Sequence, residues 1–183
     1  MKFKEFWKRY SYGIVRIFVD QIAIAIFAAA VAFGTATKYM NLTVGSSFFS
    51  VFFLLFMVAE LTFRTGVEDR EKIALGRFEK NNLTGLYMGL LANIPNFVLA
   101  VIYAVFSHID SLQNVAGLAN VIMKLIYGEY LGILTLEVGG TKLGLMPVSF
   151  FLMIVPPVIA AFLGYFLGAN GIITPKPSKK DME

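Results

Sequence analysis

The chain of 183 residues contains no cysteine and one histidine, and only 15% of its residues are charged. The lack of cysteine excludes disulfides, thiolate metal sites and cysteine nucleophiles. The low charge content is the most informative shortage, because soluble domains usually carry about 25% charged residues. Water is therefore not the main solvent of this chain. Nucleic acid is not an expected partner, because no basic surface module remains outside the apolar segments.

Hydrophobic residues make up 57% of the sequence, and the mean hydropathy is +0.71. They lie in long blocks without Asp, Glu, Lys or Arg, at 21–37, 39–59, 81–107 and 143–174. A helix needs about 20 apolar residues to cross about 30 Å of hydrocarbon. The sequence therefore predicts an all-α, polytopic integral membrane protein. Residues 1–170 form its single domain, a bundle of four transmembrane helices at about 17–37, 44–63, 84–107 and 147–169.

Lysine and arginine predict the orientation of this bundle. Most of these 16 residues precede the first helix, or lie in the loop 64–80 or in the tail 171–183. Only Lys38, Lys124 and Lys142 fall on the other side. Because an excess of basic residues marks the cytoplasmic face, we expect a multi-pass protein of the cell (cytoplasmic) membrane with both termini in the cytoplasm. The tail is expected to be flexible.

Residues 2–12 are expected to lie along the membrane surface. Aromatic residues recur there at helical spacing, and lysine and arginine lie off that stripe. The stripe consists of Phe3, Phe6, Trp7 and Tyr10. The sequence predicts an N-terminal interfacial amphipathic helix.

The segment 112–135 is long enough to cross the membrane a fifth time. Lys124 and Glu129 would then lie near the middle of the bilayer, at a cost of about 2.5–3.5 kcal/mol each. Its apolar residues also form one stripe, which is typical of a helix that lies on a membrane. We predict an outer-leaflet amphipathic helix, with a fifth crossing as the alternative.

Two carboxamides and a proline interrupt the third apolar block, in the stretch LLANIPNFVLA of residues 90–100. Asn93 and Asn96 share a helix side with small residues, and Pro95 cannot donate to the carbonyl of Leu91. That oxygen needs another partner where water is absent. One interpretation is an interhelical hydrogen bond with a kink. The other is a polar cavity between two proline-broken helices, with a candidate intramembrane site at Asn93, Pro95, Asn96, Pro156 and Pro157.

Small residues recur at helical spacing on the first, third and fourth predicted helices. They include Ala28, Ala32, Gly85, Gly89, Gly164 and Gly168. Such stripes allow membrane helices to approach closely, so we expect these three helices to form a tight bundle. The second helix carries the run FFSVFFLLFMV and is expected to be the most lipid-exposed.

Two pairs of opposite charge lie four residues apart near the predicted cytoplasmic boundary. Arg16 with Asp20, and Glu60 with Arg64, are interpreted as interfacial ion pairs. The charged residues therefore predict anchoring of helices at the headgroup level.

No enzymatic motif, cofactor site or metal site is apparent, so we do not expect an enzyme. The predicted role is a non-catalytic membrane subunit or accessory protein of a larger membrane complex. Its partners would be the lipid bilayer and, through the small-residue faces, other membrane subunits or a second copy. The alternative is a small-solute or ion transporter or channel that acts as a homo-oligomer, with a polar mid-membrane site at Asn93, Pro95 and Asn96.

Overall fold

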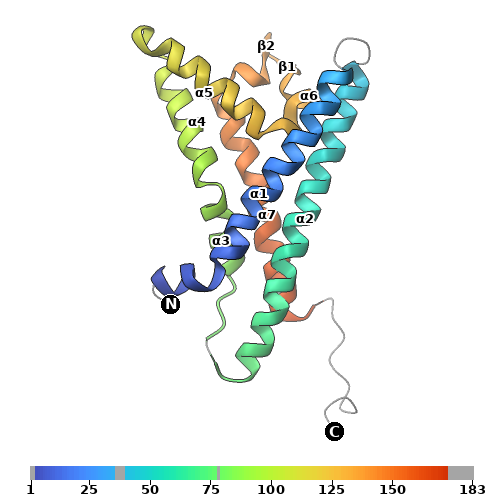
Figure 1. Ribbon diagram of the computed structural model, residues 1–183, viewed down its shortest axis with the longest axis vertical. Coiled ribbons are helices and arrows are strands. Elements are labelled where there is room, and N and C mark those ends of the chain that lie inside the picture. Colours follow the sequence, from blue (N-terminus) through green and yellow to red (C-terminus); the bar gives the residue numbers. More distant parts are fainter. Residues whose placement is uncertain (1–2, 36–39, 78, 173–183) are drawn as a thin grey trace.

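The computed structural model describes residues 3–35, 40–77 and 79–172, and these residues are mostly helical (Figure 1). The three long helices are α1 (Phe3–Thr35), α2 (Met40–Ala74) and α7 (Pro147–Asn170). Each is long and apolar enough to cross a membrane. The prediction of a mostly helical chain with several helices long and apolar enough to span a membrane is confirmed. Lys38 and most of the predicted tail lie outside the described residues.

Two further elements are bent helix pairs. The helix axis bends by 51° between α3 (Thr84–Ala92) and α4 (Ile94–Phe106). It bends by 85° in the next pair, which contains α5 (Gln113–Ile126) and α6 (Leu131–Leu134). Counting each pair as one span gives up to five apolar segments long enough to cross a membrane within the described residues.

Short elements complete the chain between α4 and α7. They are the 3-10 turns η1 (Asp110–Leu112), η2 (Gly128–Tyr130) and η3 (Leu143–Leu145), and the strands β1 (Glu137–Val138) and β2 (Thr141–Lys142). The strands pair antiparallel across Gly139 and Gly140, whose φ angles are +61° and +79°. A two-residue hairpin turn with positive φ at both positions suits glycine, which has no Cβ to clash.

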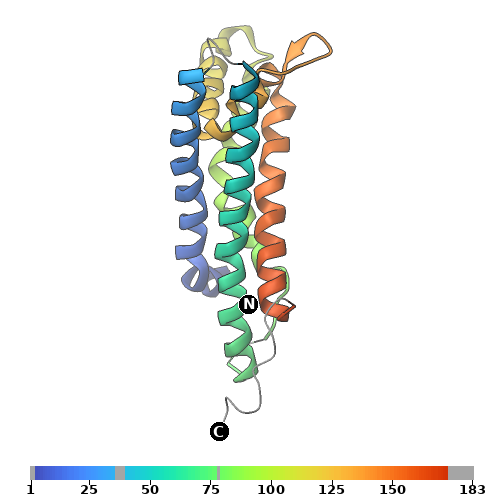
Figure 2. The same ribbon diagram turned by 90° about the vertical axis from the view of Figure 1, so that its right-hand side faces the viewer.

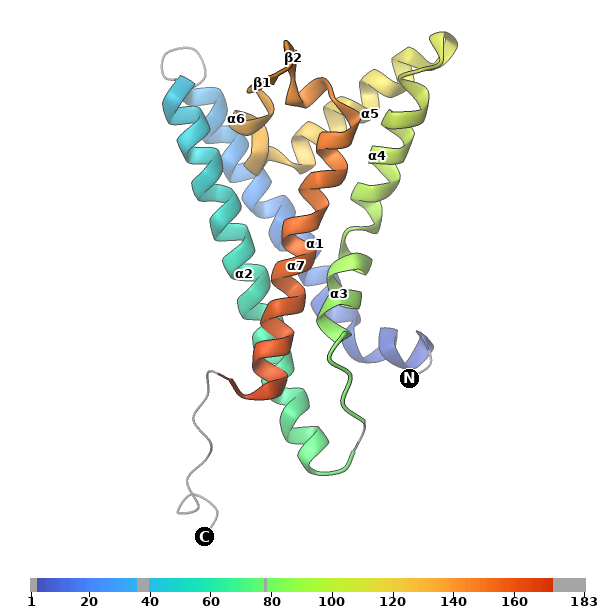
Figure 3. The ribbon, with the colours of Figure 1, turned by 180° about the vertical axis from the view of Figure 1, so that it is seen from behind.

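The segment between α4 and α7 leaves and returns at one end of the molecule. Figures 1 and 3 show that α4 ends, and α7 begins, at the end that holds α5, α6 and the hairpin. Figure 2 shows α1, α2 and α7 running beside one another along the long axis. The expected continuous surface helix over 112–135 is therefore wrong in shape, because the chain turns sharply at Tyr127 and comes back towards the same end.

The packing of α2 on α7 depends on glycines. A Cβ at Gly164 would overlap the carbonyl oxygen of Ala59, and one at Gly168 would overlap that of Phe63. The buried side of α2, part of which faces α7, is a stripe of mostly small or polar residues, whose members are Thr43, Ser47, Ser50, Leu54, Val58, Thr62, Gly66 and Asp69. The other side of α2 exposes Phe48, Phe49, Phe52, Phe53 and Phe56, and among the three long helices α2 is the least buried, in agreement with the expectation that it is the most lipid-exposed. The buried stripe was not expected.

The remaining small residues of the predicted stripes are also covered within this chain. A Cβ at Gly85 would overlap the carbonyl oxygen of Ala161, and one at Gly89 would lie 3.0 Å from the Cα of Val158. Ala28 and Ala32 are buried too. These faces serve internal packing, so they are not free for a second subunit.

Replacing Gly164 with leucine should separate α2 from α7. The added side chain must displace the backbone of Ala59, and overpacking of this kind costs about 1–3 kcal/mol or more. We expect a lower midpoint of unfolding, measured by circular dichroism during denaturation in detergent. Gly45→Leu is the matched control on α2, because nothing lies within 4 Å of a Cβ at Gly45. Equal midpoints for the two variants would contradict this packing.

Candidate functional site

The sharp turn between α5 and α6 places an acidic side chain inside the protein. Glu129 lies in η2 and is 0% exposed. The preceding Gly128 packs on α1 so closely that a Cβ would overlap the carbonyl oxygen of Ala25. On the other side of the turn, the backbone N–H of Gly132 donates to the Ser47 hydroxyl at 2.8 Å. The turn is thus fixed between α1 and α2.

A chain of carboxamides crosses from the break between α3 and α4 to α1. The Asn96 amide nitrogen donates to Gln21 Oε1 at 3.1 Å and to Asn93 Oδ1 at 3.0 Å. The Asn93 amide in turn donates to the carbonyl of Gly89 at 2.9 Å. All three carboxamide residues are at most 2% exposed. Both asparagines therefore face protein, and they connect two helices.

Gln21 joins the carboxamides to the acidic turn. Its side chain interacts electrostatically with the Glu129 carboxyl group. Tyr127 and Tyr130 also interact electrostatically with this carboxyl group, and their rings contact each other edge-on, with centroids 5.9 Å apart and planes at 77°. We call this set the polar cluster; it consists of Gln21, Asn93, Asn96, Tyr127, Glu129 and Tyr130. It joins side chains from α1, the α3–α4 break and the α5–α6 turn.

The polar cluster has more polar atoms than internal partners. In the described part of the chain, every buried side-chain nitrogen or oxygen without a hydrogen-bond partner belongs to it. These atoms are Gln21 Nε2, Asn96 Oδ1, both carboxyl oxygens of Glu129 and the hydroxyl oxygens of Tyr127 and Tyr130. Each such atom costs about 1–3 kcal/mol, and more for a charged group. Buried polar atoms without partners are uncommon in proteins, so their concentration here marks the polar cluster as the candidate site.

No protein-family model, curated protein or solved structure matches the chain.

The chemistry of the polar cluster follows from its donors and acceptors. Carboxyl, carboxamide and phenol oxygens are the ligands that hard cations prefer. No group of three or more His, Cys, Asp or Glu side chains able to hold a metal ion occurs in residues 3–35, 40–77 and 79–172. One carboxyl group among neutral oxygens suits a single positive charge, such as a proton or a small monovalent cation.

The prolines of the candidate site lie elsewhere than expected. Pro95 points outwards and is exposed, although the helix does break beside it, at Asn93. The carbonyl of Leu91 accepts a bond from a backbone N–H of the helix cap at Asn93. The helix α7 continues through Pro156 and Pro157 without a break. The expectation of a second broken helix at α7 is therefore wrong, and the α5–α6 turn takes that place.

The two predicted ion pairs form outside the polar cluster. Arg16 Nε lies 3.7 Å from Asp20 Oδ2, and Arg64 Nε donates to Glu60 Oε1 at 2.6 Å. Both pairs connect successive turns of one helix and are partly exposed. Their effect is local to α1 and α2.

A second buried carboxylate was missed by the sequence analysis. Asp69 is 2% exposed and accepts hydrogen bonds from the hydroxyls of Tyr10, at 2.6 Å, and Tyr165, at 2.9 Å. It connects α2 to α1 and α7. The sequence signal that could have found it is its helical spacing of three residues from Gly66 and seven from Thr62, in a region assigned to the loop 64–80.

Replacing Asn96 with leucine should lower the stability of the protein by about 1 kcal/mol, within the range measured for hydrogen bonds between membrane helices. In a double-mutant cycle with Gln21→Leu, we expect the two losses to overlap, because the residues share one bond. Asn120→Leu replaces Asn96→Leu in the control cycle with Gln21→Leu. Its loss of stability should add to that of Gln21→Leu, because Asn120 donates instead to the carbonyl of Gly144. The measurement is unfolding in detergent. Additive losses for Gln21 and Asn96 would contradict the shared bond.

Proposed function

We propose that the protein is an ion or small-solute transporter that binds one small cation at Glu129 as the cation crosses the membrane. The observation that carries this proposal is a fully buried carboxyl group, next to Gln21, whose oxygens accept no hydrogen bond of good geometry from the described residues and lie among the other unpartnered polar atoms of the polar cluster. An ionised carboxylate in such surroundings is costly, and a bound cation or proton removes that cost. Acidic residues inside membrane proteins commonly mark ion or proton pathways.

The arrangement of the helices supports this role. Broken helices that meet inside the membrane are typical of transporter binding sites, because irregular backbone is tolerated only where protein or a cavity surrounds it. Here the α3–α4 break at Asn93 and the α5–α6 turn at Glu129 converge on Gln21 of α1. The polar cluster carries one carboxyl group and no histidine, serine or cysteine, which suits reversible binding better than covalent catalysis.

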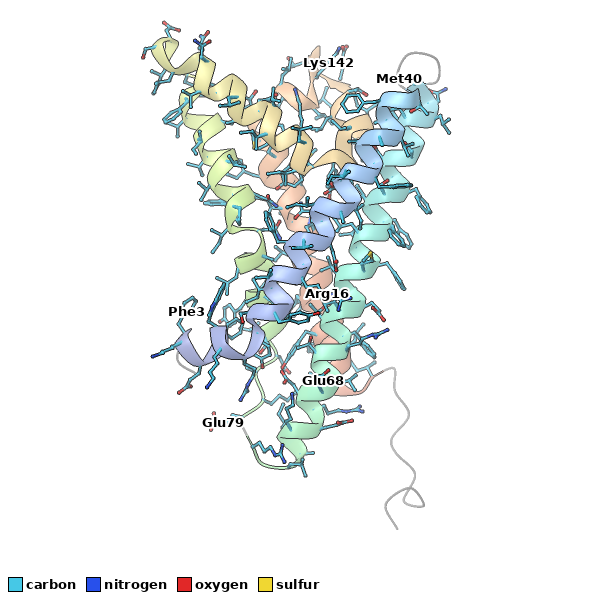
Figure 4. All side chains as sticks on the ribbon, viewed as in Figure 1. Phe3, Arg16, Met40, Glu68, Glu79 and Lys142 are labelled. Atoms are coloured by element: carbon cyan, nitrogen blue, oxygen red, sulfur yellow. The ribbon has the colours of Figure 1, made fainter. Side chains whose placement is uncertain are left out.

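Four crossings fit the proposal best. In this arrangement α1, α2, the α3–α4 pair and α7 cross, and the α5–α6 pair enters and leaves on one side (Figure 3). The first turns of α1 and the last turns of α2 carry most of the described basic residues, and they lie at the opposite end from Lys142 (Figure 4). We therefore place that basic end in the cytoplasm and the α5–α6 turn towards the outer side.

A non-catalytic subunit of a larger membrane complex ranks second. In the sequence, this role was supported by the small-residue faces. The glycines of those faces are covered by α2 and α7 of the same chain. The exposed surface of α2 is rich in phenylalanine, as lipid contact requires.

Purified protein in liposomes should dissipate a proton or a sodium gradient, reported by an enclosed pH-sensitive or sodium-sensitive dye. We expect Glu129→Gln to slow this flux at least about tenfold, because a hydrogen bond or contact to a charged group is worth about 1.5–3 kcal/mol. Glu60→Gln is the control, since Glu60 is partly exposed and pairs with Arg64. Flux that is unaffected by Glu129→Gln, or wild-type liposomes no faster than empty ones for both ions, would refute the proposal.

A further inference from the structure

A charged pocket lies at the basic end of the molecule, away from the polar cluster. It has a volume of about 580 Å³ and is lined by residues from the start of α1, the loop between α2 and α3, and α7. Its charged residues are Glu5, Arg9, Arg77, Glu79 and Lys80, so its lining is net positive. Figure 4 shows Phe3 and Glu79 at this end of the molecule, and Met40 and Lys142 at the other.

Two tyrosines of the pocket lining bind a buried carboxylate behind it. Tyr10 and Tyr165 line the pocket, and both hydroxyls donate to the buried Asp69. These two hydrogen bonds stabilise Asp69, which does not itself line the pocket. Lys80 Nζ donates to Asn170 Oδ1 at 2.5 Å, which fixes the ammonium group at the pocket while leaving two of its hydrogens for another acceptor.

An apolar groove of about 440 Å³ begins beside the charged pocket. The two share Asn81, and the groove is otherwise lined by Phe3, Phe6, Tyr87, Leu90 and Leu91. Since Tyr87, Leu90 and Leu91 succeed one another along α3, the groove runs from the basic end towards the centre of the bundle. Polar surface is thus followed by apolar surface in the direction from the cytoplasm to the hydrocarbon.

We infer that the charged pocket and the apolar groove together bind one anionic phospholipid of the inner leaflet. The phosphodiester would lie between Arg77 and Lys80, and an acyl chain would follow α3 past Leu90. The charged pocket and the apolar groove follow each other in the same order as the headgroup and the acyl chain of a lipid in the leaflet. The net positive lining suits a headgroup that carries a phosphate and no positively charged group. The exposed rings of Phe3 and Trp7 on the first turns of α1 suit the same level, at the boundary of headgroups and hydrocarbon.

Native mass spectrometry of the detergent-purified full chain tests this inference. The probes are phosphatidylglycerol, phosphatidylethanolamine with the same acyl chains, and glycerol phosphate. We expect phosphatidylglycerol to bind most tightly and glycerol phosphate, which lacks acyl chains, to bind weakly. The variant Arg77→Gln with Lys80→Gln should weaken phosphatidylglycerol binding about 25-fold, at about fivefold for each basic residue. Lys124→Gln with Lys142→Gln removes the same charge at the other end and should change nothing.

A second variant tests the groove independently of charge. Leu90→Asn makes an exposed position of the groove polar, and we expect it to weaken binding of phosphatidylglycerol several-fold without changing that of glycerol phosphate. Equal affinity for phosphatidylethanolamine, equal affinity for glycerol phosphate, or equal losses from the two double variants would each overturn the inference. Ion flux through liposomes is a separate measurement, so failure here leaves the transport proposal unaffected.

Discussion

The contact of Gly128 with the backbone of Ala25 is the constraint on which the polar cluster depends. Any larger residue at position 128 would push η2 away from α1 and carry Glu129 away from Gln21. Gly132 has the same function on the other side, where a Cβ would overlap the carbonyl oxygen of Thr43. Dispersion contacts at such short range stabilise helix association in lipid. They offset the cost of a turn that is too polar to cross the membrane unaided.

Periodicity in the sequence was sufficient to predict which side of α3 and α4 faces protein. Gly85, Gly89, Asn93, Asn96 and Ala100 are buried, as their spacing indicates, and the side at Leu90, Ile94, Phe97, Val101 and Val105 is exposed. A helix that contacts both lipid and protein must separate its residues in this way, so the pattern is strong. The position of the break was also readable, because proline at 95 removes a backbone donor.

Glu129 could not be placed from the sequence by the same reasoning. Insertion costs assume that a charged residue meets lipid, and on that assumption 112–135 belongs at the surface. The structure instead surrounds the α5–α6 turn with α1 and α2, where irregular backbone and polar side chains find protein partners. The double role of α2 escaped notice for a related reason. Its aromatic run dominates the composition, whereas the stripe from Thr43 to Asp69 is visible only at helical spacing.

The two buried carboxyl groups differ in the hydrogen bonds that the protein supplies to them. Asp69 accepts hydrogen bonds from two tyrosines on two other helices, so its charge is stabilised by protein alone and joins the helices near the basic end. Glu129 also has two tyrosines nearby, yet neither hydroxyl reaches it. On α1, Tyr10 binds Asp69 and Gln21 lies next to Glu129. These two residues are about 16 Å apart along the helix at 1.5 Å per residue. On the function proposed above, a cation takes at Glu129 the place that two tyrosine hydroxyls take at Asp69.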